Sequence, residues 1–96
     1  MGLKVKHYTE VKKFTDIPNV GPAIASDFVL LNIKSPTGLC NQDAFTLYTK
    51  LCQKSGVRHD PCVLDTFMSV IDFMNGASAR PWWTYTAARK NNYPNI

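Results

Sequence analysis

The stretch Ile17-Pro18-Asn19-Val20-Gly21-Pro22-Ala23-Ile24-Ala25 decides how the first third of this 96-residue chain folds. Two prolines and one glycine fall within five residues, so no helix can continue through it. Pro22 suits the first position of a new helix, because the N–H group that proline lacks would have no helical partner there. The stretch therefore predicts a tight hairpin that separates two helices.

Apolar residues recur at helical spacing on both sides of this hairpin. Before it, they recur every third residue and predict a helix from about Leu3 to Phe14. After it, they predict a helix that begins at Pro22 and that Asn32 can close in a left-handed conformation. The two apolar sets are Val5, Tyr8, Val11 and Phe14, then Ala23, Ile24, Phe28 and Leu31.

Three further helices are predicted from capping residues and apolar stripes. Asn41 or Asp43 can cap one over about 44–55, and Asp60 precedes a long central helix over about 61–75. The third lies near 82–91 and carries aromatic residues at its start. The sequence thus predicts an all-α fold, a single small domain of about five helices over residues 1–96.

Composition and charge narrow the class of protein. The net charge is +4, and residues 1–15 carry Lys4, Lys6, Lys12 and Lys13 against Glu10. A basic N-terminal arm is compatible with a polyanion partner such as nucleic acid, and equally with an ordinary solvated surface. No apolar run approaches the roughly 18 residues of a membrane helix, and the N-terminus lacks the apolar region of a signal peptide. We therefore expect a soluble, cytoplasmic protein without a membrane partner.

The hairpin and its flanking helices resemble a helix-hairpin-helix motif, here over about residues 8–33, with the C-terminal helices at about 43–91. In that motif, outward N–H groups and the positive end of the second helix form an anion site. The resemblance implies weak, salt-sensitive contact with duplex DNA phosphates and no sequence specificity. The implied contacts are the amides of Asn19, Val20, Gly21 and Ala23, with charge from Lys12, Lys13 and Lys34.

Two residues depart from the motif. Asn19 stands where the family usually has its first glycine, although asparagine tolerates the positive φ of such a turn. Ala23-Ile24 replaces the lysines often found after the hairpin. The alternative is therefore a hairpin that serves only as a structural corner.

A closer resemblance covers about residues 8–90. The chain is similar to a small bacterial family of pathogenicity-locus or mitomycin-resistance proteins, and its hairpin also resembles the C-terminal domain of competence regulators of the TfoX type. This implies an α-helical fold and a DNA-related role, with a link to DNA damage or mitomycin resistance. The stretches that carry the resemblance are 17–25, Leu47-Tyr48, Leu51-Cys52, 58–67 and 79–86.

The stretch Arg58-His59-Asp60-Pro61-Cys62 carries the chain's most chemically reactive residue types. Cys62 falls at the second position of the central helix, where the helix N-terminus and the nearby Arg58 and His59 lower a thiol's pKa. The hypothesis is a redox or detoxifying thiolate; the alternative is a small buried hydrophobe. Cys40 and Cys52 bring the cysteine count to three, and an odd count without a signal peptide indicates reduced thiols.

No metal, cofactor or catalytic site is expected. The cysteines and His59 lack the paired spacing of a zinc site, and no catalytic triad, carboxylate pair or nucleotide loop is present. The residues favour a non-enzymatic protein. Arg80 is expected to touch phosphate or to stack on Trp82 or Trp83. The two tryptophans are expected to close the core, with a surface for a protein partner or homodimer as the alternative.

Overall fold

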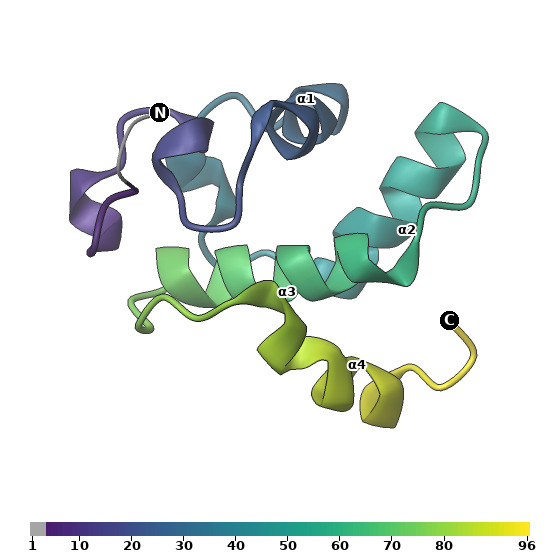
Figure 1. Ribbon diagram of the computed structural model, residues 1–96. Coiled ribbons are helices and arrows are strands. Elements are labelled where there is room, and N and C mark those ends of the chain that lie inside the picture. Colours follow the sequence, from purple (N-terminus) through teal and green to yellow (C-terminus); the bar gives the residue numbers. More distant parts are fainter. Residues whose placement is uncertain (1–3) are drawn as a thin grey trace.

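Four α-helices and four 3₁₀ turns make up the part of the chain that this computed structural model describes, residues 4–96 (Figure 1). The predicted all-α fold is confirmed, and no strand occurs in this range. The α-helices are α1 (Pro22–Leu30), α2 (Ala44–Ser55), α3 (Pro61–Met74) and α4 (Thr86–Asn92). The 3₁₀ turns are η1 (Tyr8–Glu10), η2 (Phe14–Asp16), η3 (Pro36–Leu39) and η4 (Trp82–Tyr85).

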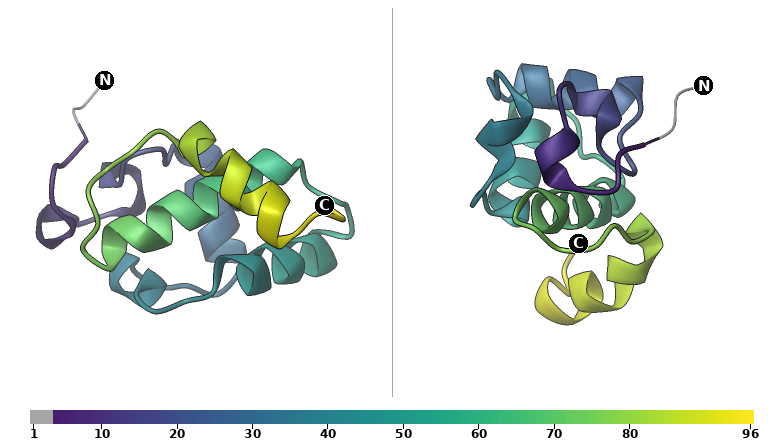
Figure 2. Two further views of the ribbon diagram at one scale, coloured as in Figure 1. Left: turned by 90° about the horizontal axis from the view of Figure 1, so that it is seen from below. Right: turned by 90° about the vertical axis from the view of Figure 1, so that its left-hand side faces the viewer.

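Helix α3 is the central helix, as the sequence predicts. It lies between a layer formed by the N-terminal turns, α1 and α2 and a second layer formed by η4 and α4 (Figure 2). Leu64, Phe67 and Val70 on α3 have no exposed surface. The Phe28 ring on α1 packs between the rings of Phe14 and Phe67, with a centroid separation of 5.3 Å to each. These contacts join the layer that contains α1 to α3. Aromatic pairs at this spacing add to the stability gained from burial.

The prediction of an α-helix from about Leu3 to Phe14 is wrong. Its residues form two short 3₁₀ turns, η1 and η2, joined by an extended Val11, and Leu3 lies outside the described residues. An apolar repeat of three residues fits a 3₁₀ turn better than the 3.6-residue α-helix. The Asp16 carboxylate also accepts the N–H groups of Lys12 and Lys13, at 3.0 and 3.1 Å, which fixes a turn there. The hairpin is therefore followed, but not preceded, by an α-helix.

Capping residues in the sequence predicted the ends of α1, α2 and α3 well. Asp43 accepts the N–H of Thr46 at 2.9 Å and begins α2, and Asp60 begins α3 in the same way. Asn32 adopts φ +63° just beyond α1, where the N–H of Ile33 donates to the Phe28 carbonyl, a Schellman ending. The last predicted helix divides into η4 and α4. Within residues 4–96, no helix is long and apolar enough to span a bilayer.

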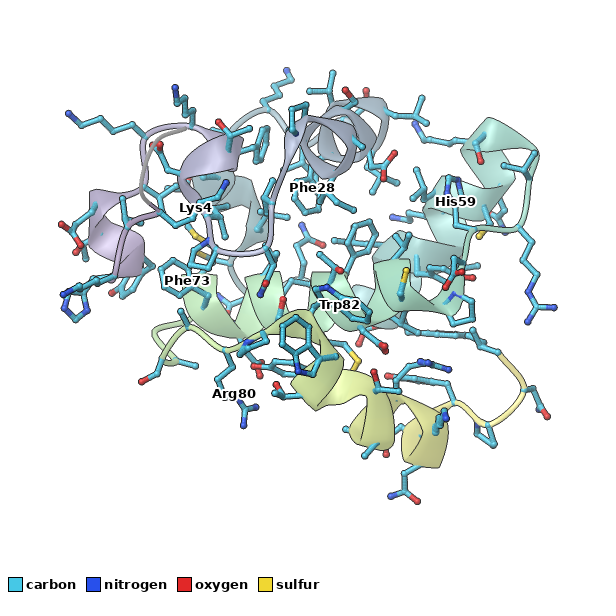
Figure 3. All side chains as sticks on the ribbon, in the orientation of Figure 1. Lys4, Phe28, His59, Phe73, Arg80 and Trp82 are labelled. Atoms are coloured by element: carbon cyan, nitrogen blue, oxygen red, sulfur yellow. The ribbon has the colours of Figure 1, made fainter. Side chains whose placement is uncertain are left out.

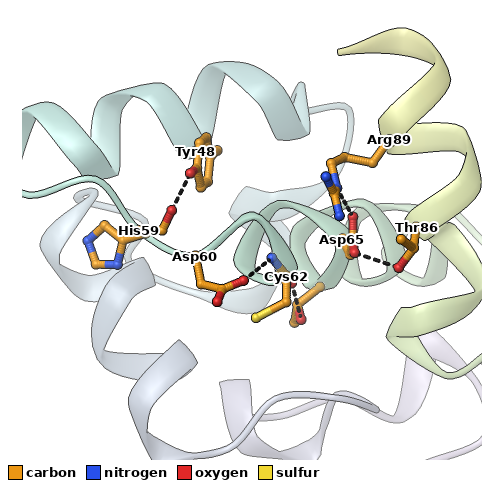
Figure 4. Close-up of polar contacts among 8 residues, drawn as sticks. Tyr48, His59, Asp60, Cys62, Asp65, Thr86 and Arg89 are labelled. Atoms are coloured by element: carbon orange, nitrogen blue, oxygen red, sulfur yellow. Dashed lines mark hydrogen bonds and ion pairs between the residues drawn. The ribbon is translucent and has the colours of Figure 1, made fainter. Parts of the chain in front are cut away.

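A buried ion pair attaches α4 to α3 (Figure 4). Arg89 Nε donates to Asp65 Oδ1 at 2.8 Å, and the Thr86 hydroxyl donates to Asp65 Oδ2 at 2.7 Å. The side chains of Arg89 and Asp65 are 9% and 1% exposed. Arg89 therefore compensates a buried carboxylate, although its position in the sequence suggests a surface cation.

We predict that Arg89→Ala lowers the free energy of unfolding by about 3–5 kcal/mol, because it leaves the Asp65 carboxylate buried without its cation. Urea denaturation followed by circular dichroism measures the change. Lys90→Ala removes the adjacent, exposed cation and should change stability by less than about 0.5 kcal/mol. Equal effects of the two substitutions would contradict the structural role of the pair.

Candidate nucleic-acid interface at the hairpin

The hairpin is a type II turn built on Pro18 and Asn19. The N–H of Val20 donates to the Ile17 carbonyl at 3.1 Å, and Asn19 has φ +72°. Asparagine adopts this left-handed region more readily than most residues, so the turn forms without the glycine usual in the motif. The Val20 side chain is 1% exposed and lies in the core. Val20 was predicted to offer its N–H to phosphate; that prediction is wrong, because the turn already uses the group.

The other predicted donors are open. Within residues 4–96, the backbone N–H groups of Asn19, Gly21 and Ala23 have no hydrogen-bond partner. Gly21 is the N-cap residue of α1, where no side chain caps the helix and no acidic residue lies in the first turn. A Cβ built on Gly21 would meet no atom within 4 Å, so there is open space beside this residue.

The side chain of Asn19 fastens the hairpin to two other parts of the protein. Its Nδ2 donates to the Ser69 hydroxyl on α3 at 3.2 Å and to the Arg80 carbonyl at 2.7 Å. The hairpin therefore lies against α3, beside the segment that leads into η4 (Figure 1). These two contacts fix the direction in which the open N–H groups point.

The predicted lysines are distributed unevenly around this hairpin. Lys12 and Lys13 are exposed on the turn before it, next to the Asp16 carboxylate. The N–H groups of Lys12 and Lys13 hold the pKa of Asp16 below its usual value, so this carboxylate stays ionised between the two lysines. Lys34 lies beyond the C-terminal end of α1, whereas the hairpin precedes its N-terminal end.

Sequence reasoning did not assign Lys4 to the site, but the structure places it against the hairpin (Figure 3). Its Nζ donates to the carbonyls of Thr15 and Val20 and so brings a positive charge to the carbonyl edge of the turn. The neighbouring Val5 N–H donates to the Asp16 carbonyl at 3.2 Å and holds this segment in place. Only the general excess of lysine near the N-terminus pointed to such a contact.

Of the other predicted residues, Arg58, His59 and Cys62 do not contact the hairpin, whereas the Arg80 carbonyl does. Arg58 is exposed, and His59 Nε2 lies 2.9 Å from the Ser55 hydroxyl, while the His59 carbonyl accepts a hydrogen bond from Tyr48 (Figure 4). Cys62 is partly buried at the start of α3. Residues 4–96 contain no cluster of three or more potential metal ligands.

The thiolate hypothesis for Cys62 is not supported. Burial, followed by the hydrogen bond and charge of the Asp60 carboxylate, raises the pKa of the Cys62 thiol. The same carboxylate already accepts the Cys62 N–H at 2.9 Å, so it occupies the helix N-terminus that was expected to stabilise a thiolate. The group is therefore a protonated thiol at neutral pH.

The aromatic segment after α3 also differs from expectation. Arg80 lies over the Tyr85 ring at 4.6 Å, whereas stacking on Trp82 or Trp83 was predicted. Tyr85, 5% exposed, is the residue that closes the core here. Trp83 is 61% exposed, so the prediction that both tryptophans close the core is wrong for Trp83.

We expect Asn19→Ala to destabilise the protein by about 2–4 kcal/mol, since it strains a left-handed residue and removes two hydrogen bonds. Asn19→Gly removes the same hydrogen bonds without the strain and should cost about 1 kcal/mol less. Thermal and urea unfolding compare the two variants. Equal losses of unfolding free energy in the two variants would show that the positive φ of residue 19 does not affect stability.

Alkylation kinetics test the Cys62 environment. In a Cys40→Ser, Cys52→Ser variant, the rate of reaction with iodoacetamide should follow a pKa above the ordinary value of about 8.5, because burial and Asp60 disfavour the thiolate. Asp60→Asn should lower that pKa, since it removes the negative charge but keeps a capping side chain. A Cys62 pKa below the ordinary value for a cysteine thiol would contradict this and support the thiolate hypothesis.

Comparison with known proteins agrees with the resemblance noted in the sequence. A sequence model of the pathogenicity-locus family matches residues 7–91. The mitomycin resistance protein McrB of Streptomyces lavendulae is 42% identical over 76 residues, which is 79% of this chain and 72% of that protein. No solved structure matches.

Proposed function

This chain belongs to the pathogenicity-locus family, and on that premise we propose that it is a non-enzymatic protein that binds the phosphate backbone of duplex DNA through its hairpin, without sequence specificity. The observation that carries the proposal is the open set of N–H groups on Asn19, Gly21 and Ala23 at the start of α1. Helices α2 and α3 have aspartate caps at this position, whereas α1 has none. Phosphate oxygens are suited to such donors, because the N-terminus of a helix favours negative charge.

The charge around the hairpin supports a phosphate ligand. Lys4, Lys12 and Lys13 lie on the segment that leads into it, together with the carboxylates of Glu10 and Asp16. Such a site neutralises few phosphates, and each one contributes a slope of about −0.9 to the dependence of log K on log salt. The complex should therefore be weak and should dissociate as salt rises.

The named relative supplies a biological context for the proposal. The Streptomyces lavendulae protein is called a mitomycin resistance protein, and we extend to this chain a role linked to mitomycin resistance or to DNA damage. Backbone contact without base contacts is compatible with a protein that acts on DNA of any sequence.

A second candidate function is a protein-interaction or regulatory module, in which the hairpin is only a structural corner. The observation that favours it is the 61% exposure of Trp83, since tryptophan is enriched at the centres of protein interfaces. A protein-interaction module requires no affinity for DNA, so a DNA-binding measurement distinguishes the two candidate functions.

We predict that the protein binds a random-sequence duplex in low salt and that Ala23→Glu abolishes the binding. The new carboxylate would occupy the first turn of α1, where it favours the helix but repels phosphate. Ala88→Glu is the matched control, because it makes the same charge change at an exposed position on α4, across α3 from the hairpin. Fluorescence anisotropy of labelled DNA at two salt concentrations, with competitor DNA, measures both variants.

Lys12→Glu with Lys13→Glu should weaken the same binding and reduce its salt dependence, because two cations are lost from the turn before the hairpin. Absence of binding by the unmodified protein in low salt, or equal effects of Ala23→Glu and Ala88→Glu, would contradict the proposed function.

A further inference from the structure

An exposed aromatic segment lies directly beside the hairpin. The Asn19 side chain donates to the Arg80 carbonyl at 2.7 Å, so residues 80–85 begin at the hairpin itself. Trp82 lies in front of α3, whereas the Arg80 side chain points downward, away from the hairpin (Figure 3). A bound strand that leaves the hairpin toward Arg80 would pass along this segment.

The exposed indole of Trp83 is held in place by its neighbours in the segment. Trp83 is 61% exposed and meets Trp82 edge to face, with ring centroids 5.8 Å apart and planes at 86°. Trp82 is half-buried, and the next turn is fixed by the Thr84 N–H and hydroxyl, which donate to the Pro81 carbonyl at 3.1 and 2.7 Å. Tyr85 is buried at the end of the turn. A large flat ring is thus held out from the surface at little cost in conformational entropy.

The charges beside Trp83 suit a nucleic acid better than a protein segment. Arg80 lies over the Tyr85 ring, and Tyr85 and Asp72 raise its pKa, so it is permanently charged. The open N–H groups of the hairpin, which Asn19 joins to the Arg80 carbonyl, add further positive potential. Asp72 is the carboxylate that acts on Arg80 and Tyr85. An exposed aromatic ring beside cations and phosphate-binding donors is typical of surfaces that bind single-stranded nucleic acid.

We propose that Trp83 stacks on an unpaired nucleobase while the hairpin holds the adjoining backbone phosphates. The preferred substrate is then duplex DNA that continues into an unpaired region, such as an overhang or a gap. This inference rests on the proposed function of the hairpin. In a fully paired duplex both faces of each internal base are covered by its neighbours, so Trp83 has no ring to stack on. The same contact at a duplex end with unpaired bases should raise affinity about 10-fold.

The test uses the full chain as a Trp82→Phe variant, in which Trp83 is the only tryptophan. A blunt duplex and the same duplex with a short single-stranded overhang are titrated in low salt. We expect strong quenching of Trp83 fluorescence and about 10-fold tighter binding with the overhang. The blunt duplex should give only slight quenching, because its two end pairs alone have an exposed base face. In the reciprocal Trp83→Phe variant, the half-buried Trp82 should not be quenched.

A second variant isolates the stacking contribution. Trp83→Ala should reduce the affinity for the overhang to that for the blunt duplex and leave blunt-duplex binding unchanged; circular dichroism melting confirms that it folds. Blunt-duplex binding without preference or quenching would overturn the stacking role and leave the hairpin function intact. Quenching by the overhang that survives Ala23→Glu would support stacking and overturn the hairpin function. Failure to bind either DNA would overturn both.

Discussion

The side-chain amide of Asn19 makes the two hydrogen bonds on which the arrangement of the whole surface depends. It donates to Ser69 on the central helix and to the Arg80 carbonyl at the start of the aromatic segment. The same residue supplies the positive φ that lets the chain turn after Pro18. One asparagine thus sets the shape of the hairpin, its position over α3 and its contact with the segment that leads to Trp83. A glycine at this position would permit the turn but would lose both hydrogen bonds, so that the hairpin would be held mainly by the buried side chains of Ile17 and Val20.

The proposed anion site at the hairpin has one α-helix instead of two. The segment before it forms two 3₁₀ turns in place of an α-helix. Lys4 lies on the carbonyl edge of the hairpin, where it compensates the partial negative charge of two carbonyls. The opposite edge carries the free N–H groups and the positive end of α1. The N-terminus of α1 is therefore uncapped, whereas those of α2 and α3 are satisfied by Asp43 and Asp60.

The sequence predicted the features that depend on neighbouring residues and missed those that join distant ones. Asp43 and Asp60 set the starts of α2 and α3, because a helix cap acts within three residues. The positive φ of Asn19 was likewise readable from residue type. Its partners Ser69 and Arg80 lie 50 and 61 residues away, and no local pattern encodes them. The buried Asp65–Arg89 pair was missed for the same reason, and the first helix because a three-residue repeat also fits 3₁₀ turns.

The central claim is that phosphate binds to particular backbone N–H groups at the start of α1. The most direct measurement is a titration of the ¹⁵N-labelled protein with duplex DNA in low salt, followed through the amide resonances. The account predicts that the resonances of Asn19, Gly21 and Ala23 shift most, that the internally bonded Val20 N–H shifts little, and that added salt reverses the changes. Shifts confined to other surfaces, or no shifts at a DNA concentration that saturates binding, would contradict it.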